Sequence, residues 1–462
     1  MHLRVKHPGI ASSIKTNLEM ENTEEQQPPL FERRVSTLTK IAYALGHIFN
    51  DLTAAMWFSY TLIYFQRVAL LEPITAGSLL LLGQIVDALM TPVFGVLVDR
   101  YLRKKIWHII GSVMVTLSFP IIFGGFAQPS STAVMLLYIS SITVFQIGWA
   151  AVQISHLSMI PALTNSLLAR ADLTAIRYSA QVGAAIAVFV VAWIVLPTNE
   201  EAVVRLDRQD SYKFRNIVLT LTAIGLATTV LFHVFLKADL LENFDLNKGN
   251  VEEARRLINN SQNDRSSWLG TTILLRVAML YVASRLFITL ATVYLPLYIE
   301  ETDVDGKEAL ATVPLVSYTS SFVAALLLKY INKSCGTKIC YLLGTLIGIL
   351  SGVVTEYGGN SAIIIYVVAI LIGSGSSITM ITALSVTAEI IGPRTERSAI
   401  VYSIVTFLDK VVTGLVVIFI EKWRCMEPEL CPSYNRDTLA LVCVLSMSIG
   451  LVTLLSISRC LG

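Results

Sequence analysis

Long apolar runs, separated by short polar segments, repeat along the chain after residue 40. A helix that spans a bilayer needs about 20 consecutive, mostly apolar residues, because hydrocarbon offers its backbone groups no hydrogen-bond partners. Twelve runs meet this requirement. They cover residues 41–66, 74–98, 106–126, 133–160, 173–196, 214–236, 271–299, 309–331, 339–357, 361–391, 398–421 and 438–458. The pattern therefore predicts an all-α membrane protein with twelve transmembrane helices.

A polar, charged segment divides these runs into six and six. It predicts two halves, residues 41–237 and 269–462, joined by a central loop over residues 238–268. Residues 1–40 are rich in Glu, Gln and Pro near their end and lack the apolar core of a signal peptide, so we expect a disordered tail. The first spanning helix then serves as an uncleaved insertion signal.

The two halves share a charged turn between apolar runs. The matching positions are Val98, Asp99, Arg100, Lys105 and Gly111 in the first copy and Ile331, Asn332, Lys333, Lys338 and Gly344 in the second. With Gly95 and Arg103, the first copy reads G-x-x-x-D-R-x-x-R-K-K. This signature resembles the loop between helices 2 and 3 of the major facilitator superfamily. The resemblance implies two pseudo-symmetric six-helix halves.

The same turns are candidates for a cytoplasmic gate. The expected gate residues are Gly95, Asp99, Arg100, Arg103, Asn332 and Lys333. Only the first copy keeps an acid, so we expect the stronger latch in the N-terminal half. Replacing Asp99 by Ala should then favour forms that are open to the cytoplasm.

Composition and charge agree with a membrane protein. Apolar residues make up 54% of the chain and mean hydropathy is +0.65. Charged residues make up 15%, against about 25% in soluble domains. Short cytoplasmic loops are enriched in Lys and Arg, and 23 of the 35 such residues lie on one side of the predicted bundle. Both termini are therefore expected to face the cytoplasm, and the net charge of +2 gives no indication of nucleic-acid binding.

Ionisable residues inside spanning helices are costly and mark candidate functional sites. Asp51 lies ten residues into the first predicted helix, and Asp87 lies twelve residues before Asp99. Both carboxylates are therefore expected near the middle of the bilayer. Gln84, Asp87 and Thr91 share one face of the second helix, which we expect to line a cavity.

Lys410 is the expected counter-charge for Asp87, because a lysine in hydrocarbon either pairs or loses its proton. The alternative is that Lys410 has only a structural role and locks the helices together. The neighbouring Asp409 points about 100° away, so it should find a different partner. Further polar candidates are Gln153 and His156 in the fourth helix and Arg285 in the seventh. His156 also fits a hydrogen-bonded packing role, and no motif indicates a metal, a cofactor or an enzyme.

Several of these residues carry a more specific resemblance. They are Gly46, Asn50, Asp51, Gly83, Asp87, Pro92, Gly95, Asp99, Pro161, Arg177 and Lys410. Together they resemble the sugar:cation symporters of the melibiose-carrier type. The resemblance implies that Asp51 and Arg177 bind substrate and that Asp87 and Lys410 belong to a cation site and its charge network. Thr91 and Gln153 stand where that family carries aspartates.

A closer resemblance extends from Tyr43 to the twelfth run. It rests on the segments 46–51, 56–58, 153–161, 284–286, 331–333, 391–393 and 407–410. These segments resemble an animal branch of the superfamily that serves lysosomes and melanosomes. The resemblance implies cysteine import into those organelles. For a zwitterionic amino acid, Arg177 or Arg285 would bind the carboxylate and Asp51 or Asp87 the ammonium, with Asp87 titrating if protons are coupled.

Two other functions stay open. A sugar or lysolipid cation symporter would use the same architecture. A non-transporting scaffold or receptor subunit of an organelle membrane would not need the buried charges, so neutralising Asp87 and Lys410 together should leave its function intact.

Two short patterns bear on the compartment. Cys425 and Cys431 lie in the loop between the last two runs, which is expected to face the lumen, where a disulfide is permitted and two free thiols are the alternative. In the central loop, Glu253, Leu257 and Ile258 fit the acidic dileucine pattern that sorting adaptors bind, although the pattern also suits an amphipathic helix.

Overall fold

The computed structural model describes residues 35–101, 103–125, 132–164, 167–196, 206–236, 268–302, 306–359, 361–391, 398–425 and 431–458. Within these ranges, twelve helices of 20 to 35 residues form one bundle without a β-strand. They are α2 (Thr37–Ile63), α3 (Pro73–Tyr101), α4 (Lys104–Phe123), α5 (Thr132–Leu157), α7 (Leu167–Val195), α8 (Ser211–Phe235), α10 (Trp268–Thr302), α11 (Ala309–Cys335), α12 (Thr337–Tyr357), α13 (Ala362–Ile391), α14 (Ser398–Lys422) and α15 (Tyr434–Ser458).

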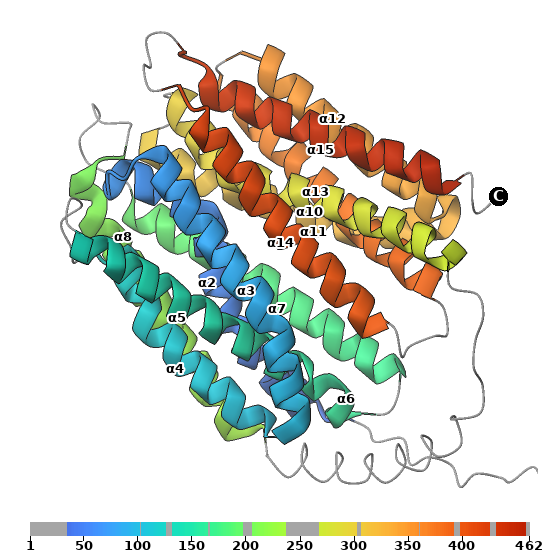
Figure 1. Cartoon of the computed structure of the whole chain (residues 1–462). Helices are drawn as coiled ribbons and strands as arrows, with labels where there is room; N and C mark the ends of the chain where they lie inside the picture. The colour runs from blue at the N-terminus through green and yellow to red at the C-terminus, as the bar shows by residue number, and fades with distance from the viewer. Residues whose placement is uncertain are drawn as a thin grey trace, which may run out of the picture.

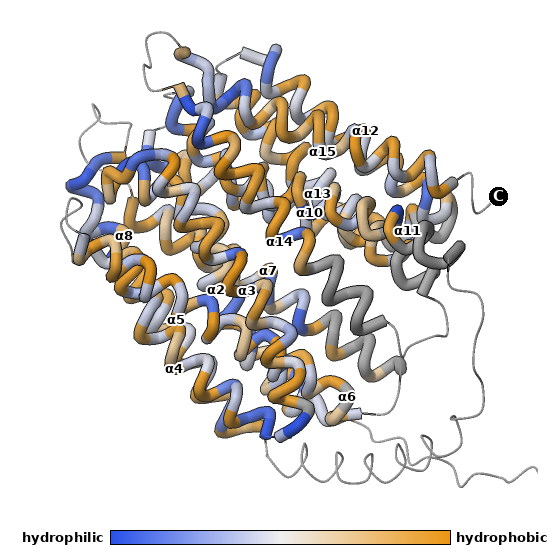
Figure 2. Tube along the Cα trace, in the orientation of Figure 1, coloured by the Kyte–Doolittle hydropathy of each residue, from blue (hydrophilic) through white to orange (hydrophobic). Residues whose placement is uncertain are grey.

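The twelve predicted spans are confirmed, each by one long helix. Ten of these helices, within the described ranges, are long and apolar enough to cross a membrane. The other two are α2 and α14, which carry buried polar residues of the candidate site. Hydrophobic residues follow the length of the bundle and hydrophilic residues gather at its two ends, as Figure 2 shows. This distribution suits a bilayer around the middle of the bundle.

The helices pack as two similar halves (Figure 1). In the first half α4 packs on α5, α3 on α5 and α2 on α8; the corresponding pairs in the second half are α12 on α13, α11 on α13 and α10 on α15. Three further pairs join the halves: α3 with α14, α7 with α11 and α2 with α10. The site described below lies where these three pairs meet.

Glycines at the repeated charged turns allow close helix packing. A Cβ atom at Gly111 of α4 would lie 2.6 Å from the carbonyl oxygen of Gly148 on α5. At the equivalent Gly344 of α12, a Cβ atom would lie 2.8 Å from the side chains of Ile378 and Thr379 on α13. Helices in membranes associate mainly through such small-residue contacts. The glycine positions of the sequence repeat therefore have the same packing role in both halves.

The two ends of the bundle differ, and we name them by their features. The disulfide end holds the short helices η1 (Tyr64–Val68), η2 (Arg208–Asp210) and η3 (Gly306–Glu308) and the Cys425–Cys431 disulfide. The tail end holds α6 (Met159–Leu163) and the start of α2, where the Ser36 side chain caps the helix by accepting a hydrogen bond from the Thr39 N–H.

Candidate transport site

A buried ion pair joins the two halves at mid-depth. Lys410 of α14 pairs with the Asp87 carboxylate of α3, which is the contact expected from the sequence. Thr91 donates a hydrogen bond to Asp87 at 3.2 Å, and the Lys410 ammonium lies 5.8 Å from the centre of the Trp149 ring. Thr91, which lies on the same helix as Asp87, and a cation–π contact between Lys410 and Trp149 of α5 therefore hold the pair in place.

A second ion pair lies beside the first on the next residue of α14. Asp409 accepts a hydrogen bond from Arg285 Nε of α10 at 3.1 Å. Adjacent residues on a helix point in different directions, so Asp409 and Lys410 pair with residues on different helices, as the sequence predicted. In this conformation Arg285 is engaged within its own half.

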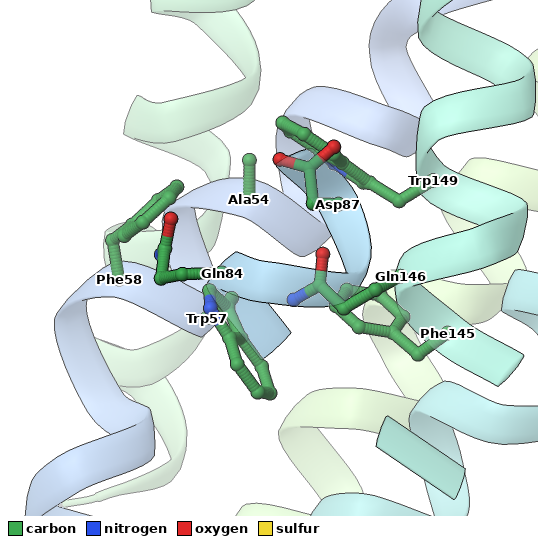
Figure 3. Close-up of a pocket in the computed structure, with 8 residues that line it drawn as sticks. All are labelled: Ala54, Trp57, Phe58, Gln84, Asp87, Phe145, Gln146 and Trp149. Carbon is green, nitrogen blue, oxygen red and sulfur yellow. The ribbon is translucent and has the colours of Figure 1, made fainter. Parts of the chain in front are cut away.

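A narrow pocket opens next to Asp87. It is lined by Ala54, Trp57, Phe58, Gln84, Asp87, Phe145, Gln146 and Trp149. In Figure 3, Asp87 lies beside the Trp149 ring, and Gln146 extends from α5 toward Trp57 and Gln84. The cavity has a volume of about 10 Å³, which is room for about one water molecule. The pocket is therefore closed around its polar groups in this conformation.

Asp51 and Arg177, predicted from the sequence to bind substrate, are joined through His47. The His47 Nδ1 atom lies 2.9 Å from Asp51 Oδ1, one turn along α2. Its Nε2 atom lies 3.0 Å from the Arg177 Nη2 atom on α7. His47 and Asp51 are buried. An acid, an imidazole and a guanidinium thus form one chain of contacts inside the first half.

The His156 ring lies beside the His47 ring. It stacks on Tyr43 at 4.1 Å between ring centres, and its Nε2 atom lies 2.7 Å from the Tyr43 carbonyl oxygen. Its ring centre is 5.1 Å from that of His47. These contacts give His156 the packing role that the sequence left as an alternative; substrate contact remains a proposal. Gln153, also predicted, is half-buried on α5.

Among the described residues, polar contacts between the halves are concentrated at the disulfide end. The buried Glu421 of α14 accepts hydrogen bonds from Gln66 at 2.8 Å and from Tyr294 at 2.9 Å, and it pairs with Arg424 at 2.9 Å. Gln66 belongs to the first half and the other residues to the second. This carboxylate therefore ties η1 to α10 and α14.

Two more carboxylates make equivalent ties. Glu300 of α10 pairs with Arg67 of η1 at 2.5 Å. Asp210, in the first half, binds Lys213 of its own half at 3.1 Å and Lys307 of the other half at 2.7 Å. Glu300 and Asp210 are buried. The disulfide end is thus closed by charge pairs that link the halves.

The predicted gate at the tail end is only partly described. Arg100 and Arg103 are exposed, and a Cβ atom at Gly95 would meet nothing within 4 Å. The side chains of Asp99, Asn332 and Lys333 lie outside the described part of the structure. So do residues 1–34 of the tail and the central segment 237–267 with the dileucine pattern. Gate and sorting roles therefore remain proposals.

The Cys425–Cys431 disulfide is present, with a Cα–Cα distance of 6.2 Å. It closes the loop that follows α14, next to Arg424. The bridge therefore constrains the segment beside the Glu421 network.

Sequence reasoning missed two residues of the site. It assigned no role to His47, although a histidine four residues before Asp51 lies on the same helix face. It also left out Trp149, whose ring lies against the Lys410 ammonium. In addition, it counted Arg67 and Arg424 only as loop charges. Arg67 pairs with Glu300 on α10, so no local pattern identified it, whereas Arg424 pairs with Glu421 only three residues before it.

Comparisons with known proteins agree with this architecture. The family model for MFS/sugar transport proteins matches residues 42–420. Major facilitator superfamily domain-containing protein 12 of Homo sapiens is 35% identical over 421 residues, covering 86% of this chain and 88% of the relative. The Sodium-dependent lysophosphatidylcholine symporter 1 of Gallus gallus is 25% identical over 42% of this chain and 39% of its own length.

Solved structures show the same fold. A D-xylose-proton symporter superposes with a TM-score of 0.67 at 13% identity, covering 89% of this chain and 96% of the other. A xylose transporter from E. coli in an inward-open conformation gives a TM-score of 0.65 at 13% identity, with 89% and 94% covered. The chain therefore belongs to the MFS/sugar transport protein family of the major facilitator superfamily and is a multi-pass membrane protein and secondary transporter, not an enzyme.

Proposed function

We propose that the chain transports cysteine, or a closely similar zwitterionic amino acid, into lysosomes or related organelles by alternating access. The observation that carries this proposal is the Asp51–His47–Arg177 chain, which holds an acidic and a basic group on either side of one ring. A zwitterionic amino acid presents an ammonium to the acid and a carboxylate to the guanidinium. Arg285, Gln153 and His156 are the further proposed substrate contacts.

In this proposal, Asp87 and Lys410 form the coupling site. A proton or another cation at Asp87 would weaken the pairing with Lys410 and so loosen the contact between α3 and α14. The tail end faces the cytoplasm and the disulfide end faces the lumen, in keeping with the basic loops on one side and with the disulfide on the other. The closed disulfide end then corresponds to a carrier that is shut toward the lumen.

Radiolabelled cysteine uptake into vesicles, with and without the transporter and at two lumenal pH values, tests this function. Wild-type protein should accumulate cysteine. Asp51→Asn, Arg177→Gln and Lys410→Ala should each abolish uptake while the protein still reaches the membrane. Uptake that persists in all three variants would refute the site, and uptake that ignores both the pH gradient and Asp87→Asn would refute proton coupling there.

A sugar or lysolipid symporter is the second candidate, favoured by the family description and by the printed name of the chicken relative. Competition binding to purified protein separates the two. If cysteine fails to displace a bound sugar or lysolipid, the amino-acid proposal is wrong. Intact function after neutralising Asp87 and Lys410 together would instead favour a scaffold.

A further inference from the structure

Trp149 of α5 contacts both groups of polar residues in the candidate transport site. The centre of its ring lies 5.8 Å from the ammonium of Lys410, which pairs with Asp87 (Figure 3). At the edge of the ring, the Nε1–H donates a hydrogen bond at 3.2 Å to the backbone carbonyl oxygen of Asn50 on α2. Asn50 directly precedes Asp51, the carboxylate proposed to bind substrate. One rigid ring therefore joins the proposed coupling site to the turn of α2 that carries the proposed substrate site.

The Asn50 carbonyl oxygen accepts side-chain hydrogen bonds in addition to its place in the helix. In an α-helix such an oxygen accepts the backbone N–H four residues further on. Here the Thr53 hydroxyl donates to it at 3.0 Å, and the Trp149 N–H donates to it as well. A side chain that enters the hydrogen-bond ladder of a helix changes the local bend. The position of the Trp149 N–H therefore influences how α2 presents Asp51.

We propose that Trp149 is a positioning residue that couples the Asp87–Lys410 pair to substrate binding at Asp51. When the coupling ion occupies Asp87, the Lys410 ammonium loses its carboxylate partner and keeps the ring face of Trp149. The indole is planar and rigid, so a shift of its face also moves its N–H edge. A hydrogen bond of 3.2 Å is at the long end of the usual range, so a small shift breaks it. The inference rests on the proposed function, since it takes Asp51 as a substrate contact and Asp87 as the coupling site.

Two cations face Asp87 from the helices around it. They are Lys410 of α14, which pairs with it, and Arg285 of α10, which is itself paired with Asp409. The α2 and α5 helices present uncharged side chains to the pocket beside Asp87, and the arginine of η1 pairs with a carboxylate of α10. Of these groups, Lys410 contacts Trp149. A change of ion at Asp87 therefore reaches the ring through Lys410.

The test measures uptake of radiolabelled L-cysteine by full-length protein in proteoliposomes, between about pH 5 and pH 8 and with either Na⁺ or choline present. Wild-type KM should differ between ion-bound and ion-free conditions by about fivefold or more, as is common for coupled sites. Trp149→Phe keeps an aromatic face for Lys410 but removes the N–H that Asn50 accepts. The KM of this variant should therefore be the same in both conditions.

Trp57→Phe is the matched control. Trp57 lines the same pocket, and its Nε1 atom has no hydrogen-bond partner within the described part of the chain. The same change of ring then removes no hydrogen bond, so KM should still depend on the ion. An ion-dependent KM in Trp149→Phe, or loss of the dependence in both variants, would overturn the inference.

If wild-type protein takes up no L-cysteine, the proposed substrate is wrong, and if its KM is the same in every condition, the proposed coupling is wrong. A measurement without substrate then decides the role of Trp149. The chain has six tryptophans, so fluorine NMR of protein labelled with fluorotryptophan should give six signals. Replacing each tryptophan in turn assigns them, and elimination assigns Trp149 if its own variant does not fold.

The Trp149 signal should shift in Lys410→Met, which changes the group at its face, and also in Asp51→Asn, which changes the residue after the carbonyl at its edge. A Trp149 signal that is unchanged in Asp51→Asn would contradict the link between the two sites, whether or not Lys410→Met folds.

Discussion

Four charged side chains in the middle of the bundle form two ion pairs that balance each other. Asp87 pairs with Lys410 across the halves, and Asp409 pairs with Arg285 within the second half. A buried charge is tolerated in a membrane protein when a partner neutralises it. The cost of removing one member is therefore the cost of the charge left behind.

Breaking the Asp87–Lys410 pair should destabilise the protein more than removing it altogether. Lys410→Met leaves a buried carboxylate, and Asp87→Asn leaves a buried ammonium, so each should lower the free energy of unfolding by about 3–5 kcal/mol. The double variant Asp87→Asn/Lys410→Met leaves no unpaired charge and should recover most of this loss. Thermal unfolding of each purified variant in detergent measures the loss of stability. Additive losses in the double variant would show that the pair does not interact.

For single residues, the sequence predicts those contacts that depend only on how deep each residue lies along its helix. Asp87 and Lys410 lie at similar depths in their helices, so their pairing followed from counting residues. The role of His47 also depends on how α7 is rotated toward α2, because only that rotation brings Arg177 to the ring. A single sequence contains no signal for such a rotation.

Helix packing depends on glycines that the charged repeat places at equivalent points of the two halves. Gly148 and Gly111 bring the backbones of α5 and α4 close together, and Gly344 does the same for α12 and α13. The number and order of helices were predictable from apolar length, because each span must satisfy its own backbone. Apolar length does not predict which helices pair, since lipid-facing and partner-facing surfaces are both apolar.

Gly148→Leu should separate α4 from α5. A Cβ atom at Gly148 would lie 2.7 Å from the Met114 Cβ atom and 2.8 Å from the Gly111 carbonyl oxygen, so a larger side chain cannot fit without backbone movement. We expect a loss of about 1–3 kcal/mol, measured as a lower Tm. Ser140→Leu, at an exposed position of the same helix, is the matched control and should leave Tm near the wild-type value. Equal Tm values for both variants would contradict the close packing.

On the scale of the whole molecule, the described charge pairs between halves lie at mid-depth and at the disulfide end. Three carboxylates at that end each bind a group of the opposite half: Glu300 binds Arg67, Glu421 binds Gln66 and Asp210 binds Lys307. The sequence did not predict these ties, because pairing across halves is a property of one conformation. The charges in the loops indicated only which side of the membrane each loop faces.

Cross-linking the halves at this end should stop transport. In a variant with Asp210→Cys and Lys307→Cys, a reducible bis-methanethiosulfonate cross-linker should join the two cysteines, because the native ion pair at 2.7 Å places the two positions within the reach of two side chains. Alternating access requires this end to open, so uptake should fall to background and return after mild reduction. Each single variant serves as its control. Full transport by the cross-linked protein would show that the disulfide end does not part during the cycle.

The clustering of these three carboxylates has a kinetic consequence. Parting the halves there separates two ion pairs, Arg67–Glu300 and Asp210–Lys307, and each separated charge is stable only after water reaches it. Rearrangement at that end therefore has a barrier set by the separation of these charges. The turnover rate should depend on how fast water enters the disulfide end, and much less on how tightly the solute is bound.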